Sequence, residues 1–141
     1  MKLTISTALL VGLLTQPALA SHQSPAPQAC PNVTAIQSAG VNMARLSSMF
    51  GWMVYNMKDN LGTPEQWSFV MYLGGAANDE TDAIAKATVG LKTLAFVEGP
   101  APADNDHYRW SCVYRTDPGF YAGAVTPPVE LLSNIFSRYK N

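Results

Sequence analysis

Two cysteines, Cys30 and Cys112, constrain the fold of this 141-residue chain more than any other feature of its sequence. Both follow residues 1–20, which are typical of a secretory leader, and in an oxidising compartment a pair of thiols usually forms a disulfide. Two cysteines permit one intramolecular bond, and closing so long a loop stabilises a fold by about 4–5 kcal/mol if the effect is entropic. The alternative is a reactive thiol pair, although the Cys-x-x-Cys spacing of redox motifs is absent. We predict a structural Cys30–Cys112 disulfide.

The first twenty residues have the parts of a signal peptide. Lys2 gives a positive start, residues 8–14 are apolar, and Ala18-Leu19-Ala20 supplies the small residues of a cleavage site before Ser21. An uncleaved anchor is the alternative, but the apolar part is short for a hydrocarbon layer of about 30 Å, and no later run approaches the roughly 20 apolar residues of a span. We expect cleavage before Ser21, no membrane span, and a secreted or periplasmic protein.

The rest of the chain predicts a single domain. Its composition, with 48% hydrophobic and 13% charged residues, is that of a globular protein. Residues 21–29 are polar and contain prolines, so we expect a flexible lead-in there. Residues 30–141 are then expected to form one globular domain, which is long enough to bury a real core.

Strand patterns dominate this domain, and no internal repeat is visible in the sequence. The segment 67–73 would place Trp67, Phe69, Met71 and Leu73 on one face, because side chains alternate along a strand. Asp117-Pro118-Gly119 is a turn signal between the last two predicted strands. The ranges with strand character are 33–41, 52–57, 67–73, 107–115 and 120–125.

Helical patterns are fewer. Residues 79–94 predict the main helix, with Asn78 or Asp79 as its cap, and Thr126 with Pro127 would begin a short C-terminal helix. Residues 43–50 permit a short helix, and 99–106 are expected to form a loop. Because strands and helices do not alternate regularly, we predict an α+β fold. It is a mostly antiparallel sheet of about four or five strands packed against one main helix plus a short C-terminal helix, with one disulfide.

Charge and motif content exclude several classes of function. The formal net charge is −1, so a nucleic-acid partner is not expected. Two histidines and two cysteines are too few for a zinc finger or a dedicated metal cage. His22 and His107 are the candidate bases for a nucleophile, and the nucleophile-elbow, zinc-protease and P-loop motifs are absent. We expect a binding protein and not an enzyme.

Methionines recur every four residues at Met49, Met53 and Met57. Thioether clusters in secreted proteins can bind Cu(I), which is a soft ion. The same spacing also places methionines on one packed face, where they fill gaps in a core. Core packing is the preferred interpretation, because no histidine accompanies the cluster.

The predicted hairpin that starts at His107 carries the residues a porphyrin would need. A haem site requires an apolar slot, an axial ligand such as His, Tyr or Met, and cations for two propionates. His107, Arg109 and Arg115 would share one strand face, whereas Trp110, Cys112 and Tyr114 would share the other. The same residue types also occur on ordinary half-buried strands, and the Cys-x-x-Cys-His motif of covalent haem is absent.

The whole chain resembles a family of small secreted hemin-binding proteins of Gram-negative intracellular pathogens. The resemblance is carried by the overall length, the leader MKLTISTALLVGLLTQPALA, and the segments WMVYNM, QWSFVMYLGG, DETDAIAKA and YRWSCVY. It implies non-covalent hemin binding or assistance of hemin uptake.

On this interpretation, His107 or Tyr108 is the expected axial ligand, because imidazole and phenolate both suit ferric hemin. Arg109 and Arg115 are the expected partners of the propionates. The alternative is a disulfide-stapled interaction or inhibitor module that acts on an envelope or host protein, and a small hydrolase is a third interpretation. A hemin titration separates the first from the others.

Overall fold

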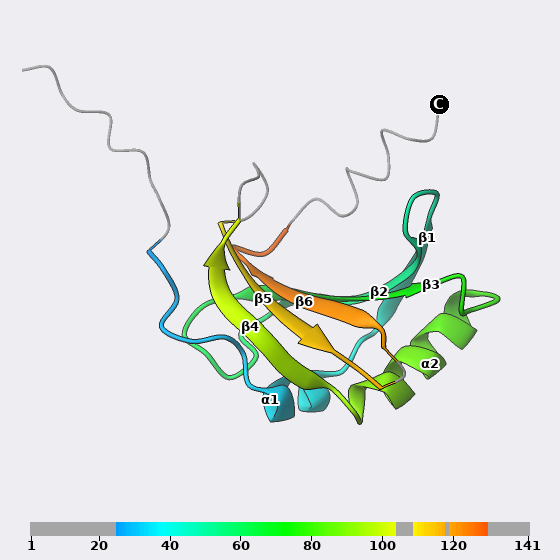
Figure 1. Cartoon of the computed structure of the whole chain (residues 1–141), viewed down its shortest axis with the longest axis horizontal. Helices are drawn as coiled ribbons and strands as arrows, with labels where there is room; N and C mark the ends of the chain where they lie inside the picture. The colour runs from blue at the N-terminus through cyan, green and yellow to red at the C-terminus, as the bar shows by residue number, and fades with distance from the viewer. Residues whose placement is uncertain (1–24, 104–108, 118, 130–141) are drawn as a thin grey trace, which may run out of the picture.

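A computed structural model describes residues 25–103, 109–117 and 119–129, which form two helices and a six-stranded antiparallel sheet (Figure 1). The strand order is β1-β2-β3-β6-β5-β4. The elements in chain order are α1 (Val33–Ala39), β1 (Met43–Ser47), β2 (Gly51–Asp59), β3 (Trp67–Gly74), α2 (Glu80–Leu91), β4 (Ala95–Pro102), β5 (Trp110–Arg115) and β6 (Tyr121–Thr126). The predicted α+β class is confirmed.

The order of the elements repeats although the sequence does not. A helix followed by three consecutive antiparallel strands occurs twice, first as α1 with β1–β3 and then as α2 with β4–β6. The two meanders join where β3 pairs with β6, in the middle of the sheet. Both helices lie on one side of the sheet (Figure 1).

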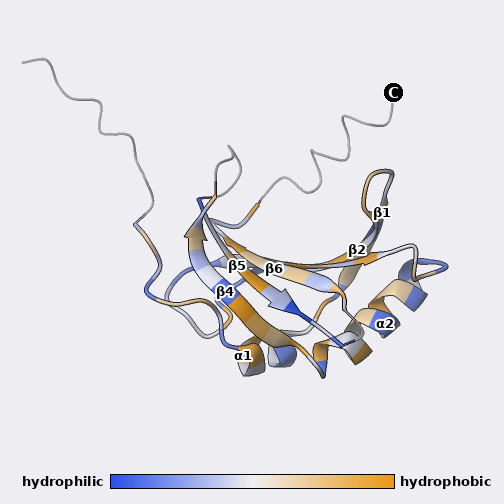
Figure 2. Cartoon of the chain, in the orientation of Figure 1, coloured by the Kyte–Doolittle hydropathy of each residue, from blue (hydrophilic) through white to orange (hydrophobic). Residues whose placement is uncertain are grey.

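The main core lies between the helices and the sheet. As predicted, Trp67, Phe69, Met71 and Leu73 of β3 are all buried in this core, together with Cys112 and Tyr114 of β5. Ile36 of α1 and Ala83, Ala87 and Leu91 of α2 pack on them. Figure 2 shows that the first turn of α2, in contrast, is hydrophilic.

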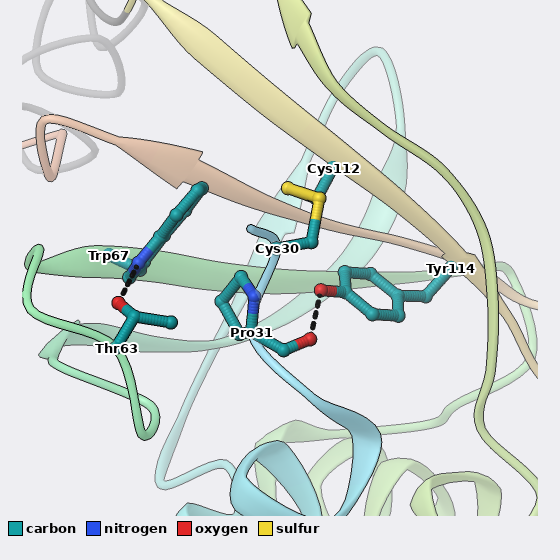
Figure 3. Close-up of a disulfide and its surroundings, with 6 residues drawn as sticks. All are labelled: Cys30, Pro31, Thr63, Trp67, Cys112 and Tyr114. Atoms are coloured by element: carbon teal, nitrogen blue, oxygen red, sulfur yellow. Dashed lines mark hydrogen bonds between the residues drawn. A yellow bond between two sulfur atoms is a disulfide. The ribbon is translucent and has the colours of Figure 1, made fainter. Parts of the chain in front are cut away.

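The predicted disulfide is confirmed. Cys30 and Cys112 are bonded, at a sequence separation of 82 and with 5.8 Å between their Cα atoms. The bond ties the segment before α1 to β5, the strand next to the β4 edge of the sheet (Figure 3). Close to it, the hydroxyl of Tyr114 donates a 2.6 Å hydrogen bond to the backbone oxygen of Pro31. Pro27 is also buried, so the described end of the expected lead-in packs on the domain.

Helix α2 begins and ends close to the prediction. Asp79 is its N-cap, because the side chain accepts a 2.8 Å hydrogen bond from the backbone N–H of Asp82. Asp82 and Lys86 form an ion pair one turn apart at 2.8 Å. The helix stops at Leu91 rather than residue 94, since the N–H groups of Lys92 and Thr93 turn back to carbonyls only three residues earlier.

Two early predictions are wrong, and local hydrogen bonds explain both. Residues 33–39 form helix α1 and not a strand, because the Asn32 side chain caps it by accepting from the N–H of Ala35 at 2.7 Å. Gly40, at φ 68°, ends the helix. The range 43–50 contains strand β1 and not a helix. Its end is marked by Ser47, whose hydroxyl accepts from the N–H groups of Met49 and Phe50 in the following turn.

The sheet has six strands and not four or five, because β1 and β4 were not predicted as strands. Strand β4 covers the first half of the expected loop, and it contains Gly99, Pro100 and Pro102. Prolines are tolerated there since β4 is an edge strand, with one side unpaired. Gly99 has a φ of 125° and no room for a side chain, because a Cβ would lie 2.9 Å from the sulfur of Cys30.

The predicted C-terminal helix does not begin at Thr126. Thr126 is the last residue of β6, and its hydroxyl donates to the backbone oxygen of Gln66. Residues 127–129 are not helical, and the remainder of the predicted helix lies outside the described residues. Within the described part of the chain, no helix has the length and apolar character needed to cross a membrane.

Candidate ligand-binding face of the sheet

The sheet has a second face, directed away from α1 and α2, which we call the open face. Its central part is formed by alternate residues of β2, β3, β6 and β5, because residues paired across antiparallel strands point to the same side. These residues are Met53, Tyr55, Met57, Ser68, Val70, Tyr72, Tyr121, Gly123, Val125, Ser111, Val113 and Arg115.

Of the four predicted hemin-site residues, two lie within the described part of the chain, at opposite ends of β5. His107 and Tyr108 lie outside the described residues. Arg109 is exposed immediately before β5, and its backbone N–H donates to the oxygen of Thr126. Arg115 is exposed at the other end of β5, on the open face. Arg115 follows Arg109 by six positions along the chain, which corresponds to about 20 Å between their Cα atoms in a strand.

One cross-strand row brings two tyrosines and an arginine together. In register across the sheet, Met53 pairs with Tyr72, Tyr72 with Tyr121, and Tyr121 with Arg115. Neighbouring strands are about 4.8 Å apart, so these side chains are adjacent. Phe50 packs edge-on against Tyr72, with ring centroids 5.8 Å apart. The row is therefore aromatic at its centre and cationic toward β5.

Tyr121 and Arg115 form the most accessible polar pair of this row. The side chain of Tyr121 is 57% exposed, and its hydroxyl oxygen accepts a 3.1 Å hydrogen bond from an Nη of Arg115. The guanidinium carbon also lies 4.9 Å from the centroid of the tyrosine ring, which is a cation–π distance. The phenol oxygen is thus presented to solvent with a positive charge beside it.

Next to the Tyr121–Arg115 pair, the sheet surface is apolar, and no side chain projects from it at Gly123. Gly123 pairs with Val70 on one side and with Val113 on the other, so a residue without a side chain lies between two valines. A Cβ at Gly123 would approach only the backbone oxygen of Cys112, at 3.6 Å. Val70 is only 8% exposed, so a flat apolar ligand would approach the sheet here over Gly123 and Val113.

The β2–β3 part of the open face carries a second hydrophobic cluster. Met53, Tyr55 and Val70 are only 4%, 3% and 8% exposed, and Met57 and Tyr72 pack against them. The predicted methionine face holds for Met53 and Met57, whereas Met49 lies in the turn after β1 and is 73% exposed. Core packing therefore explains Met53 and Met57.

Tyr114 is not available as a ligand, although it belongs to the same hairpin. Its side chain is buried on the helix face, and its hydroxyl is bound to Pro31 (Figure 3). Burial raises the pKa of the Tyr114 phenol well above its ordinary value of 10.0. A phenol held neutral and enclosed cannot ligate an external metal ion.

An open groove on the other side of the molecule is a weaker candidate. It has a volume of about 430 Å³ between α2 and the β5–β6 turn, where Val89 and Phe120 give it an apolar lining. Lys86 borders it, but the ammonium is occupied by Asp82 at 2.8 Å and by the oxygen of Ala76 at 2.6 Å. None of the residues that line this groove is a tyrosine, histidine or methionine, so the groove lacks an axial ligand for iron.

Tyr121 belongs to the hairpin that the sequence offers as the haem site, but His107 or Tyr108 was the predicted axial ligand. The position of Tyr121 directly after the Asp117-Pro118-Gly119 turn identified it as a strand residue, but the choice of face depends on pairing with β3 and β5. The pairing with Arg115 is a register effect of the hairpin. The sequence does contain a signal for this pairing, since Arg115 lies two positions before the turn and Tyr121 lies two positions after it.

These features define a class of protein: a disulfide-bridged α+β domain whose sheet is covered by helices on one face and presents a tyrosine–arginine pair on the other. The chain belongs to the DUF4949 family, described as a domain of unknown function, which matches residues 29–134. That range includes both cysteines and every described helix and strand. No curated protein and no solved structure matches the chain.

Proposed function

We propose that this protein binds ferric hemin non-covalently on the open face of its sheet, with Tyr121 as the axial ligand. The observation that carries the proposal is the exposed Tyr121 phenol, whose oxygen accepts a hydrogen bond from Arg115. Phenolate is a suitable ligand for ferric iron, and an adjacent guanidinium compensates its negative charge. The low apolar surface around Gly123 supports the approach of a flat ring.

Arg115 has a second role in this proposal. A guanidinium has five N–H donors, so donors remain for a propionate after one has bound Tyr121. Both propionates leave the same edge of a porphyrin, and Arg109 stands about 20 Å further along the strand. The proposal therefore assigns the propionate contact to Arg115 and leaves Arg109 outside the site. His107 and Tyr108 remain an alternative pair of ligands at the Arg109 end.

The proposed location is a secreted or periplasmic one. A disulfide that closes 82 residues supports an oxidising compartment. In that setting the protein would hold or deliver hemin, without chemical change to it.

A titration with ferric hemin tests the proposal. The wild-type protein is expected to give a saturable Soret shift, which Tyr121→Phe abolishes and Arg115→Gln weakens. Arg109→Gln is the matched control at the other end of β5 and should leave the titration unchanged. A Soret shift retained in Tyr121→Phe but lost in His107→Ala with Tyr108→Phe would move the site to the Arg109 end. Absence of any saturable shift in the wild-type protein would refute hemin binding.

A second candidate function is interaction with an envelope or host protein through the β1 edge. Leu46 of β1 is 61% exposed, and Met49 and Phe50 of the following turn are 73% and 52% exposed, so exposed apolar side chains gather here. Leu46→Ser with Met49→Ser is expected to abolish a partner contact and to leave hemin binding intact. Chemical cross-linking in the exporting cell, with and without these substitutions, measures the contact.

A further inference from the structure

The groove between α2 and the β5–β6 turn has walls that hydrogen bonds hold in place. The hydroxyl of Thr93, just after α2, donates to the backbone oxygen of Asp117 at 2.9 Å and accepts from the backbone N–H of Asp117 at 3.0 Å. The hydroxyl of Thr116 accepts from the N–H of Phe120 at 3.1 Å, on the other side of the turn. The two ends of the turn are thus fixed beside α2 (Figure 1), and the groove of about 430 Å³ is preformed.

The lining of this groove is apolar, and part of it is exposed. Val89 is 63% exposed on α2, and Ala85 lies one turn before it on the same side of the helix. Phe120 lines the groove from the turn. A hydrocarbon placed between Val89 and Phe120 would remove apolar surface of both side chains from water, which is favourable.

Gly90 keeps the groove open between α2 and Phe120. It lies in the interior of α2, where glycine is less favourable than alanine. The backbone does not require a glycine here, because Gly90 is not among the residues with positive φ. Packing does not require one either, since a Cβ would lie in ordinary contact, 3.5 Å from the sulfur of Met71 and 3.5 Å from a ring carbon of Phe120. The glycine therefore leaves space in the groove at the expense of helix stability.

The charges around the groove favour a cationic ligand. The Lys86 ammonium is compensated, because it lies 2.8 Å from the Asp82 carboxylate and donates to the oxygen of Ala76. Asp117 uses its backbone groups to bind Thr93, and no cation within the described part of the chain pairs with its carboxylate. Among the residues that line the groove, Asp117 thus carries the uncompensated charge.

We propose that this groove binds an apolar primary amine, that is, a hydrocarbon chain or ring that carries one ammonium group. The hydrocarbon packs between Val89 and Phe120, over Gly90, and the ammonium pairs with the carboxylate of Asp117. Because Asp117 is exposed, the hydrocarbon supplies most of the affinity and the charge supplies the preference for an amine. The groove is separate from the open face, so the inference does not depend on hemin binding.

Isothermal titration calorimetry with three eight-carbon probes tests the inference. The probes n-octylamine, n-octanol and octanoate share one hydrocarbon chain and differ in the charge of the head group at pH 7. Octylamine is expected to bind saturably at one site. Octanol should bind about two- to five-fold more weakly, because an exposed ion pair contributes modestly, and octanoate more weakly still. No saturable binding of octylamine, or equal affinities for octylamine and octanoate, would overturn the proposal.

Two substitutions narrow the groove. Ala85→Phe fills it from α2 and should weaken octylamine binding about ten-fold or more. Thr88→Phe, at an exposed position of α2 outside the lining, is the matched control and should leave binding unchanged. Gly90→Ala should weaken binding and yet raise the temperature of thermal unfolding, because alanine favours a helix. Full affinity for octylamine in Ala85→Phe, which thermal unfolding shows to be folded, contradicts the proposed site.

A third substitution tests the charge. Asp117→Asn should make the affinities for octylamine and octanol equal, whereas Glu98→Gln, an exposed carboxylate of β4 outside the groove, should keep the preference for the amine. A preference that survives in Asp117→Asn would exclude Asp117 as the partner of the ammonium. Octylamine should bind equally well to Tyr121→Phe, so that failure of the hemin titration and failure of this inference are distinguishable.

Discussion

At the scale of single residues, a buried hydroxyl holds the segment before α1 on the sheet. Tyr114 donates to the oxygen of Pro31 across 83 positions of sequence, next to the disulfide. Both groups are withdrawn from water, so the acceptor would have no replacement partner if the hydroxyl were removed.

Tyr114→Phe is expected to lower the free energy of unfolding by about 1–2 kcal/mol, because it leaves the Pro31 carbonyl buried without a donor. The same substitution at the exposed Tyr121 is the control and should change stability by less than about 0.5 kcal/mol. Urea unfolding followed by tryptophan fluorescence measures both. Equal effects of the two substitutions would contradict the role of the Tyr114–Pro31 bond.

At the scale of elements, the start of α2 is held by charge as well as by its cap. Asp82 accepts from the Lys86 ammonium at 2.8 Å and from the backbone N–H of Asn78 at 2.9 Å. These two hydrogen bonds hold the pKa of the Asp82 carboxyl below its ordinary value of 3.8. The folded state thus favours the charged carboxylate.

A lowered pKa makes the contribution of Asp82 dependent on pH. Because the unfolded chain takes up the proton first, this contribution is present above about pH 4 and is lost as the pH falls through the folded-state pKa. When the pH is lowered from 5 to 3, the thermal stability of Asp82→Asn is therefore expected to fall less than that of the wild type. Glu80→Gln, in the same turn, is the comparison, and thermal unfolding at each pH is the measurement. A wild-type pH dependence that survives in Asp82→Asn would contradict the prediction.

At the scale of the whole molecule, the disulfide connects the segment before α1 to the second meander. Cys30 precedes α1 and the first meander, and Cys112 lies in β5, within the second meander. A bond across 82 residues removes many conformations from the unfolded chain.

Replacement of both Cys30 and Cys112 by serine is expected to lower the free energy of unfolding by about 2–5 kcal/mol. The fold should survive at low temperature, because most of the core does not involve the sulfurs. Reduced wild-type protein should unfold at nearly the same urea concentration as the double variant. A thiol titration that finds two free thiols in the native, unreduced protein would exclude the bond.

Local sequence patterns were sufficient where one interaction dominates. The cap predicted at Asn78 or Asp79, the alternation of Trp67 to Leu73 and the pairing of two cysteines each depend on neighbouring residues or on elimination. The structure places the cap at Asp79 and confirms the other two. Local sequence patterns failed where the β propensity of the side chains competed with a helix cap. Val33 and Ile36 favour a strand by composition, but Asn32 and Gly40 delimit a helix.

Edge strands were missed for a related reason. β4 contains two prolines and a glycine, and local patterns class such a segment as a loop. Its strand conformation comes from pairing with β5, which follows it after residues 103–109. β1 likewise pairs along its whole length with β2. Only the neighbours in space could show that these segments complete the sheet.

The sequence by itself determined the α+β class, the disulfide, the main helix and the residues that face it, because alternation, caps and cysteine number act locally or by exclusion. The candidate site was decided by the tertiary structure. Arg115 reaches Tyr121, and Tyr121 reaches Tyr72, through the register of β5, β6 and β3, and a shift of one residue would turn each of them to the other face. Register is set by the packing of the whole sheet, and no single segment of the chain contains it.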